Sequence, residues 1–317
     1  MIQELAKELI SQGLKEKAQD IYVMPRDNGY EIFMRIGDDR RYIAQYGDDI
    51  MLSLISHFKF VSGMNVGEKR RTQLESCDYE FENKQVVSLR LSTVGDYRNK
   101  ESLVIRILYT KQNRLTYWYD GIDNLKSALG GRGLYLFSGP VGSGKTTLMY
   151  ELIRAVFYDK QIISIEDPVE IKDDSMLQLQ LNESIGMTYD NLIKLSLRHR
   201  PDILIIGEIR DSETARAVIR ASLTGAMVFS TIHAKSISGV YDRLLELGVS
   251  LEELRNGLTF VAYQRLLNGG ALIDYRTEKL DKYIPDAWNE KISRLVKEGV
   301  ITKEQGKVEK IKAIQTA

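Results

Sequence analysis

The residues best suited to chemistry form the run Gly139-Pro-Val-Gly142-Ser-Gly144-Lys145-Thr146, which fits the phosphate-loop pattern G-x-x-x-x-G-K-[ST]. Glycines let backbone N–H groups approach phosphate oxygens, and a following helix adds partial positive charge. We expect Lys145, in a solvent-facing loop, to neutralise phosphate oxygens and the Thr146 hydroxyl to bind Mg²⁺. The run therefore predicts a nucleoside triphosphate site that includes Gly139, Pro140, Val141, Gly142, Ser143, Gly144, Lys145, Thr146 and Thr147.

Acidic side chains follow two apolar runs: Glu166, Asp167 and Glu170 come after residues 162–165, and Glu208 comes after residues 203–206. Ligands of an open parallel sheet bind outside the carboxyl ends of its strands. We therefore expect Glu170 and Glu208 to orient and activate a water molecule, the alternative being that they only cap helices. Gly207 stands where a Mg²⁺-linked aspartate is usual, so metal binding is expected to rest on Thr146, the phosphates and water-mediated contacts to the other acids. His233 follows another apolar run and is either structural or part of this site.

The candidate site residues can meet only if the strands before them end at the same edge of one sheet. The second part of the chain has the pattern of such strands. Short apolar runs of the buried parallel-strand type alternate with helical stretches, which predicts a doubly wound α/β sheet. The runs are residues 134–137, 162–165, 203–206 and 227–229, and the helical stretches are 147–158, 189–200 and 212–223. Leu177, Leu179 and Leu181 alternate with polar residues and indicate a half-buried strand beside the sheet. The stretch from Ser250 onward is expected to be helical and charged.

The first part of the chain has a different pattern. An amphipathic helix is expected over residues 1–16, a strand over 30–36 after the turn Asp-Asn-Gly, and a helix over 48–62 that stops at Gly63. Two further strands are expected, over residues 86–91 and 102–108. The polar stretch 111–121 is expected to be a flexible linker. We therefore divide the chain into an α+β domain, 1–112, and an ATPase-type domain, 113–317.

Composition excludes several classes of protein. The 317 residues are 43% hydrophobic and 28% charged, which is typical of a globular protein and not of a disordered one. Lys plus Arg and Asp plus Glu both number 44, so no global positive field attracts nucleic acid, and direct nucleic-acid binding is not expected. Cys77 is the only cysteine, which excludes an intrachain disulfide. No apolar run approaches the length of a membrane span, and a cytoplasmic location is expected.

Taken together and in order, the motifs resemble those of the secretion ATPases that power type II secretion, type IV pili and DNA-uptake pseudopili. The resemblance covers about residues 18–268. Residues 139–146 are similar to the family's Walker A loop, and residues 166–170 to its Asp box E-D-P-x-E. Residues 203–208 are similar to its atypical Walker B motif, which ends in Gly-Glu, and residues 223–233 to its His box. The turn after Gly63 and the strands that contain Arg90 and Arg106 are also similar to the family's N-terminal domain.

The resemblance implies a RecA-like P-loop ATPase domain with a mostly parallel sheet, preceded by a small α+β domain of the PAS-like kind. It implies ATP and Mg²⁺ as cofactors, Glu170 and Glu208 as catalytic acids, and His233 as a residue that senses or positions the γ-phosphate. A four-cysteine insertion, a long N-terminal extension and a retraction-type C-terminal motif are missing, which favours the competence branch of Gram-positive bacteria. That branch implies a cytosolic homo-hexamer beneath a polytopic membrane platform protein, assembling a pseudopilus for DNA uptake.

Arginines complete the expected site. In the family, arginines of the N-terminal domain reach the nucleotide, which implies this role for Arg90, Arg98 and Arg106, with a surface charge or a salt bridge as the alternative. Arg210 is expected to bind phosphate or to pair with a neighbouring acid. Two other functions stay open: a motor for pilus retraction or another secretion system, and a slow nucleotide-dependent scaffold or regulator.

Overall fold

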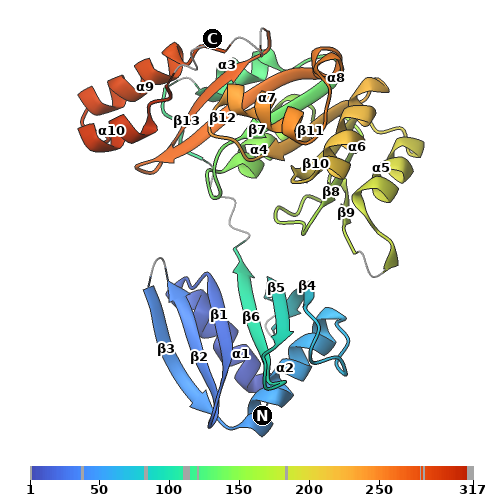
Figure 1. The fold of residues 1–317 in the computed structure, drawn as a ribbon, viewed down its shortest axis with the longest axis vertical. Helices are drawn as coiled ribbons and strands as arrows, with labels where there is room; N and C mark the ends of the chain where they lie inside the picture. The colour runs from blue at the N-terminus through green and yellow to red at the C-terminus, as the bar shows by residue number, and fades with distance from the viewer. Residues whose placement is uncertain are drawn as a thin grey trace. The chain divides into compact units, whose positions relative to one another are not determined.

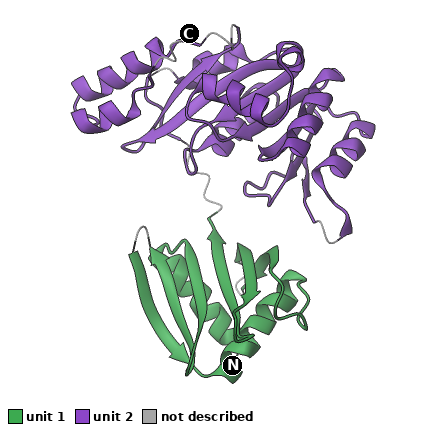
Figure 2. Cartoon of the chain, viewed as in Figure 1, with its two compact units in different colours: residues 1–111 green, residues 112–317 purple. Residues whose placement is uncertain are grey.

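The chain divides into two compact units, residues 1–111 and 112–317 (Figure 2). The computed structural model describes residues 2–36, 39–81, 85–109, 115–119, 121–182, 185–278, 280 and 283–312. The domain boundary expected between residues 112 and 113 lies outside the described residues. Each unit has a hydrophobic core of its own, as is usual for a domain.

The first unit is a six-stranded antiparallel sheet with the strand order β3-β2-β1-β6-β5-β4 (Figure 1). Its strands are β1 (Asp20–Arg26), β2 (Gly29–Ile36), β3 (Asp39–Tyr46), β4 (Gln73–Glu80), β5 (Val86–Gly95) and β6 (Glu101–Leu108), and its helices are α1 (Ile2–Glu16) and α2 (Asp48–Ser62). Alternate strand residues such as Ile21, Val23 and Ile105 pack with apolar residues of both helices. The helices therefore cover one face of the sheet, and the α+β character expected for this part of the chain is confirmed.

Local predictions in this unit are confirmed where the sequence pattern is strong. The amphipathic stretch forms α1, the turn at Asp27 and Asn28 joins β1 to β2, and α2 ends at Gly63. Gly63 has a φ of 78° and donates its backbone N–H to carbonyls of the last turn, a common helix ending. Strands β1, β3 and β4 were not predicted, because β1 contains Pro25 and the other two carry polar residues on both faces.

The second unit is built on a seven-stranded sheet with the order β13-β12-β7-β11-β10-β8-β9 (Figure 1). The strands are β7 (Gly133–Ser138), β8 (Ile162–Glu166), β9 (Leu177–Gln180), β10 (Ile203–Ile209), β11 (Met227–Ile232), β12 (Leu258–Leu267) and β13 (Gly270–Arg276). Every neighbouring pair is parallel except β12 and β13. The mostly parallel sheet expected from the sequence is therefore confirmed.

Helices cover both faces of this sheet. They are α3 (Gly121–Ala128), α4 (Lys145–Val156), α5 (Tyr189–Arg198), α6 (Ser212–Leu223), α7 (Ile237–Glu246), α8 (Leu251–Gly257), α9 (Asp286–Lys297) and α10 (Lys303–Glu309). Side chains of β7 alternate between two cores: Leu134 and Leu136 join α6 and α7, whereas Tyr135 and Phe137 join α3 and α4. A strand that is buried on both faces is apolar throughout, which is why β7 was predictable from sequence.

The expectation that the chain is helical from Ser250 onward is wrong. Only α8 follows Ser250 directly, and the chain then forms the hairpin of β12 and β13 before it returns to helix in α9 and α10. β12 lies between β7 and the edge strand β13 and is buried along most of its length. Its sequence LTFVAYQRLL interrupts the apolar run with Gln264 and Arg265, so the pattern resembled an amphipathic helix.

The expectation of a flexible linker over residues 111–121 is wrong for its second half, while residues 111–114 and 120 lie outside the described part of the chain. Trp118 donates its backbone N–H to the carbonyl of Ala271 at 2.9 Å and its indole N–H to the carbonyl of Leu267 at 2.8 Å. Tyr117 donates its hydroxyl to Glu151 at 2.6 Å. These contacts fix Tyr117 and Trp118 to the hairpin of β12 and β13 and to α4.

Cys77 lies on β4, partly buried against the core of the first unit. Burial, assisted by the negative charge of Asp78, raises the pKa of its thiol from the ordinary value of 9.0 to about 11. Since the thiolate is the reactive form, iodoacetamide should alkylate the folded protein about 100-fold more slowly than the urea-unfolded protein at the same pH. Mass spectrometry over time gives both rates, and equal rates would contradict the assigned environment.

Candidate active site at the phosphate loop

The loop Gly139–Thr146 connects the carboxyl end of β7 with the N-terminus of α4 (Figure 1). Gly139, Gly142 and Gly144 have φ values of 146°, 73° and 83°, which favour glycine. Gly144 is the N-cap of α4, and no side chain caps the helix there. The first N–H groups of a helix have no partner within it. The uncapped end of α4 therefore suits a bound anion such as a phosphate group.

Lys145 is the first residue of α4, and only 8% of it is exposed. Its ammonium donates to the carbonyl oxygens of Gly139 at 3.1 Å and Pro140 at 3.0 Å. The expected solvent-facing position of Lys145 is therefore wrong, because the loop folds over its side chain. Burial lowers the pKa of Lys145, and the negative charges of Glu208 and Glu170 oppose that shift. The lysine charge is thus held inside the loop and close to both acids.

The other loop residues differ in exposure. Val141 is 86% exposed at the tip, while Thr146 and Thr147 are half-buried in the first turn of α4. The Ser143 hydroxyl is buried and has no hydrogen-bond partner among the described residues. No group of three or more His, Cys, Asp or Glu side chains in the described part of the chain is arranged to hold a metal ion. The role of Thr146 as a Mg²⁺ ligand stays a prediction.

Glu208 and His233 meet beside Lys145. Glu208 lies near the end of β10, and His233 directly follows β11, the neighbouring parallel strand. The imidazole Nε2 of His233 is 2.7 Å from Glu208 Oε1, and its Nδ1 is 3.1 Å from the carbonyl oxygen of Gly139 and 3.4 Å from Lys145 Nζ. A single histidine ring therefore links the phosphate loop to a candidate catalytic acid.

Arg210 pairs with the acids of the site. Its Nε donates to Glu208 Oε2 at 2.9 Å, and its guanidinium lies 3.7 Å from Asp167. The structure thus shows the ion pair that was one of the two alternatives for this residue. An open hollow of about 310 Å³ lies beside the pair and is lined by Glu208, Ile209, Arg210, His233 and Arg243.

Arg243 was not identified from the sequence. It lies on α7, ten residues beyond His233 and outside every motif, and only the packing of α7 brings it to the hollow. Its guanidinium donates to the backbone carbonyl of Arg210 at 3.4 Å and forms an ion pair with Glu246 at 3.1 Å. The site therefore contains a second arginine besides Arg210.

Gln264 is another residue in contact with the phosphate loop that the sequence did not reveal. It is 1% exposed on β12, and its amide donates to the carbonyl of Ser143 inside the phosphate loop. A Cβ atom at Gly139 would lie 2.3 Å from the backbone oxygen of Gln264, and one at Gly144 would lie 2.8 Å from its amide nitrogen. The glycines of the loop are therefore required for close packing against β12 as well as for their backbone angles.

The acidic box at the end of β8 has a buried and an exposed part. Glu166 is 3% exposed and accepts hydrogen bonds from the hydroxyls of Tyr150 and Ser164. Burial raises the pKa of Glu166, and these donors oppose the shift. Glu170, four residues later, is exposed in the loop before β9. Glu166 is therefore a buried, hydrogen-bonded residue, and a role of the exposed Glu170 toward water stays a prediction.

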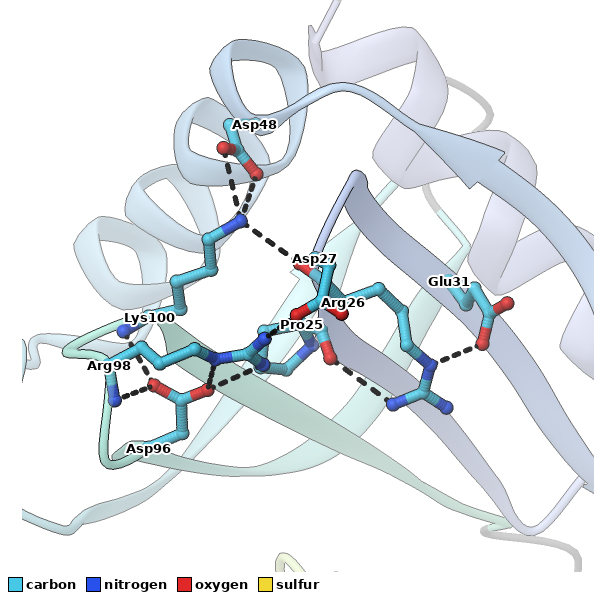
Figure 3. A network of polar contacts seen from close by, with 8 residues as sticks. All are labelled: Pro25, Arg26, Asp27, Glu31, Asp48, Asp96, Arg98 and Lys100. Carbon is cyan, nitrogen blue, oxygen red and sulfur yellow. Dashed lines mark hydrogen bonds and ion pairs between the residues drawn. The ribbon is translucent and has the colours of Figure 1, made fainter.

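The three arginines expected to reach nucleotide lie in the first unit. Arg98 pairs with Asp96 and with Asp27, in a polar network that joins the β1–β2 and β5–β6 turns (Figure 3). Arg106 donates to both carboxylate oxygens of Asp20, at 2.7 and 3.4 Å. Arg90 lies directly opposite Arg106 on the neighbouring strand. Salt bridges within the unit are therefore present for Arg98 and Arg106, and a role of these arginines toward nucleotide stays a prediction.

Residues 1–291 match the family described as Type II/IV secretion system protein. The chain belongs to this family of type II/IV secretion system proteins. Relatives of this secretion protein include "Competence protein ComGA" of Streptococcus pneumoniae, 61% identical over 311 residues, which are 98% of this chain and 99% of the relative. "Competence protein ComGA" of Bacillus subtilis is 36% identical over 274 residues, which are 84% of this chain and 76% of the relative.

The fold of this secretion protein also occurs in solved structures. A crystal structure of the pilus retraction motor PilT with bound ADP aligns with a TM-score of 0.75 and 21% identity, covering 98% of both chains. At this identity the likeness concerns the fold alone, and it confirms the expected RecA-like ATPase fold after a small α+β domain. Family membership confirms the resemblance to secretion ATPases, and with it the expectation that the chain is an ATPase.

Proposed function

We propose that this secretion ATPase is a hexameric motor that drives assembly of a competence pseudopilus for DNA uptake. The proposal is supported by the 61% identity to a protein named as a competence protein, over nearly the full length of both chains. The observation that best supports ATP hydrolysis is the contact of His233 with both Glu208 and the phosphate loop. It joins a phosphate-binding element and an acid at the edge of the sheet where ligands bind.

Each residue of the site has a proposed task. Lys145 and the N-terminus of α4 would hold the phosphates, and Thr146 would supply a ligand to Mg²⁺. Bound Mg²⁺ would neutralise charge on the phosphate oxygens. Glu208 and Glu170 would orient the attacking water and accept its proton. His233, between the loop and Glu208, would report to the acid whether a γ-phosphate is present.

The motor would act at the inner face of the cell membrane through a polytopic platform protein. No helix in the described part of the chain is long and apolar enough to cross a membrane, so the proposed membrane contact runs through this partner. The proposed partner is implied by the family and by the competence relatives. An assay of ATP turnover with and without the platform protein tests it, because a coupled motor should be stimulated.

A hexameric ring is proposed because arginines of a neighbouring subunit would complete the nucleotide site. Transfer of a phosphoryl group needs cations around the γ-phosphate. Arg210 is already paired with Glu208, and Arg243 with Glu246. Arg90, Arg98 and Arg106 of the first unit are the further candidates, and Arg98 and Arg106 would have to exchange their carboxylate partners for phosphate. Such an exchange would couple nucleotide binding to movement of that unit.

A subunit-mixing experiment tests the ring. Lys145→Ala subunits, inactive in their own sites, are added to wild-type protein in increasing proportion. ATP turnover should fall more steeply than the wild-type fraction, because each inactive subunit also impairs the neighbour that depends on it. Light scattering of the same mixtures should give the mass of a hexamer.

A strictly proportional loss of turnover, together with a monomer mass, would contradict the ring. A different result would favour the slow scaffold or regulator. In that case the wild-type protein, with the platform protein present, would hydrolyse ATP no faster than the Lys145→Ala protein.

A further inference from the structure

Strand β9 is an edge strand whose two faces differ in chemistry. Leu177 and Leu179 alternate with Gln178 and Gln180. In the parallel pairing with β8, Gln178 lies opposite Ser164 and Gln180 lies opposite Glu166. The glutamines therefore share one face with the polar end of β8, beneath the loop that leads from β8 to β9.

The two glutamine side chains hold this loop on either side of Glu170. Val169 donates its backbone N–H to Gln180 Oε1 at 3.1 Å. The Gln178 amide donates to the backbone carbonyl of Ile171 at 2.8 Å, and its oxygen accepts the backbone N–H of Asp173 at 2.7 Å. The residues immediately before and after Glu170 are thus each fixed by a different side chain of β9.

Glu170 itself has no such fixing contact. Its side chain is exposed, and no hydrogen bond or ion pair joins its carboxylate to another described residue. Its charge nevertheless acts on Lys145, which places the carboxylate near the phosphate loop. The backbone of its loop therefore sets the region that the carboxylate can reach, and that backbone is held by the contacts of Val169, Ile171 and Asp173 with β9.

Gln178 is itself rigidly held. Its amide also donates to the Tyr150 hydroxyl at 3.1 Å, and Tyr150 belongs to α4, the helix that begins at the phosphate loop. The same hydroxyl donates to the buried Glu166. A buried group that loses its partner is costly, so this network resists rearrangement. The Glu170 loop is therefore tied to the helix that begins at the phosphate-binding residues.

We propose that Gln178 and Gln180 are positioning residues that set the location of the Glu170 carboxylate for ATP hydrolysis. The inference rests on the catalytic role proposed for Glu170. It adds a structural dependence: turnover depends on the glutamine side chains of β9 because they place Glu170. A misplacement of about 1 Å at a reacting group can cost about 10²-fold in rate, so weakening one anchor should be visible in kcat.

The test is a double-mutant cycle on the full-length protein. Gln178→Met and Gln180→Met keep the side-chain length and remove the hydrogen bonds. Each should lower kcat for ATP by about tenfold, with little change in KM or in binding of a fluorescent ATP analogue. In a Glu170→Gln background, either substitution should lower the remaining single-turnover rate by less than about twofold, because the group being positioned is already lost.

Gln161→Met is the matched control, since Gln161 is exposed at the opposite end of β8 and should keep wild-type turnover. Circular dichroism monitors folding, and Gln178→Asn and Gln180→Asn replace any methionine variant that does not fold. Equal losses in the wild-type and Glu170→Gln backgrounds would overturn the inference, and so would wild-type kcat in both variants. Wild-type turnover of Glu170→Gln alone would overturn the catalytic role of Glu170 itself, and with it the positioning role.

Discussion

Replacing Lys145 with alanine should lower ATP turnover by about 10²–10³-fold, the range seen when one preorganised electrostatic donor is removed from an active site. The ammonium is buried in the phosphate loop and supplies a positive charge that the described part of the site does not duplicate at that position. Binding of ATP should weaken as well, because the charge acts on the bound phosphates before any reaction. Steady-state turnover and calorimetric titration with ATP measure the two effects.

The fold should survive this change. Alanine is a good helix former at the first position of α4, and the two carbonyls that Lys145 contacts lie in the loop next to solvent-accessible Val141. Lys160→Ala, in an exposed turn of the same unit, is the matched control and should hydrolyse ATP at the wild-type rate. Wild-type turnover of a folded Lys145→Ala protein would show that the phosphate loop is not the site of hydrolysis.

Glu208→Gln should separate binding from catalysis. The amide keeps the size of the side chain but cannot accept a proton, so turnover should fall at least about tenfold and up to about 10⁴-fold. ATP binding should be nearly unchanged, because Lys145 and the N-terminus of α4 remain in place. The structure adds a detail: the change also weakens the pairs with Arg210 and His233, so both side chains become freer to move.

Rapid-mixing measurements of ATP binding and of phosphate release distinguish the two steps. Glu213→Gln is the control, since Glu213 lies in the exposed first turn of α6 and outside the site. Loss of ATP binding in Glu208→Gln, with turnover reduced in proportion, would make Glu208 a structural or metal-linked residue and would leave Glu170 as the remaining catalytic acid.

The parts of this protein that were predictable are those in which a local pattern decides the structure. The central strands are buried on both faces, so their composition alone marked them, and the positive-φ glycines of the phosphate loop are tied to its sequence pattern. The hairpin of β12 and β13 was missed because Gln264 and Arg265 give β12 a mixed pattern, although its place between β7 and β13 buries most of it. Tertiary context overrode the periodicity there.

The candidate site also combines residues that were predictable from the sequence with residues that were not. Lys145, Glu208 and His233 belong to motifs, and the parallel strands bring their ends together as the sheet rule requires. Arg243 and Gln264 belong to no motif, and their places follow only from how α7 and β12 pack on their neighbours. Burial of Lys145 was also beyond the sequence, because it depends on the path of the loop around the side chain.

The alternation of leucine and glutamine in β9 has a consequence for how this protein can change over time. Side chains of a strand point to alternate faces, so a shift of β9 by one residue against β8 would place leucines where Gln178 and Gln180 now stand. Inserting or deleting a single residue between the two strands invites that shift. Such a length change, which a surface loop usually tolerates, would here leave the loop of Glu170 without its two anchors. Substitutions in this connection should therefore accumulate more readily than insertions or deletions.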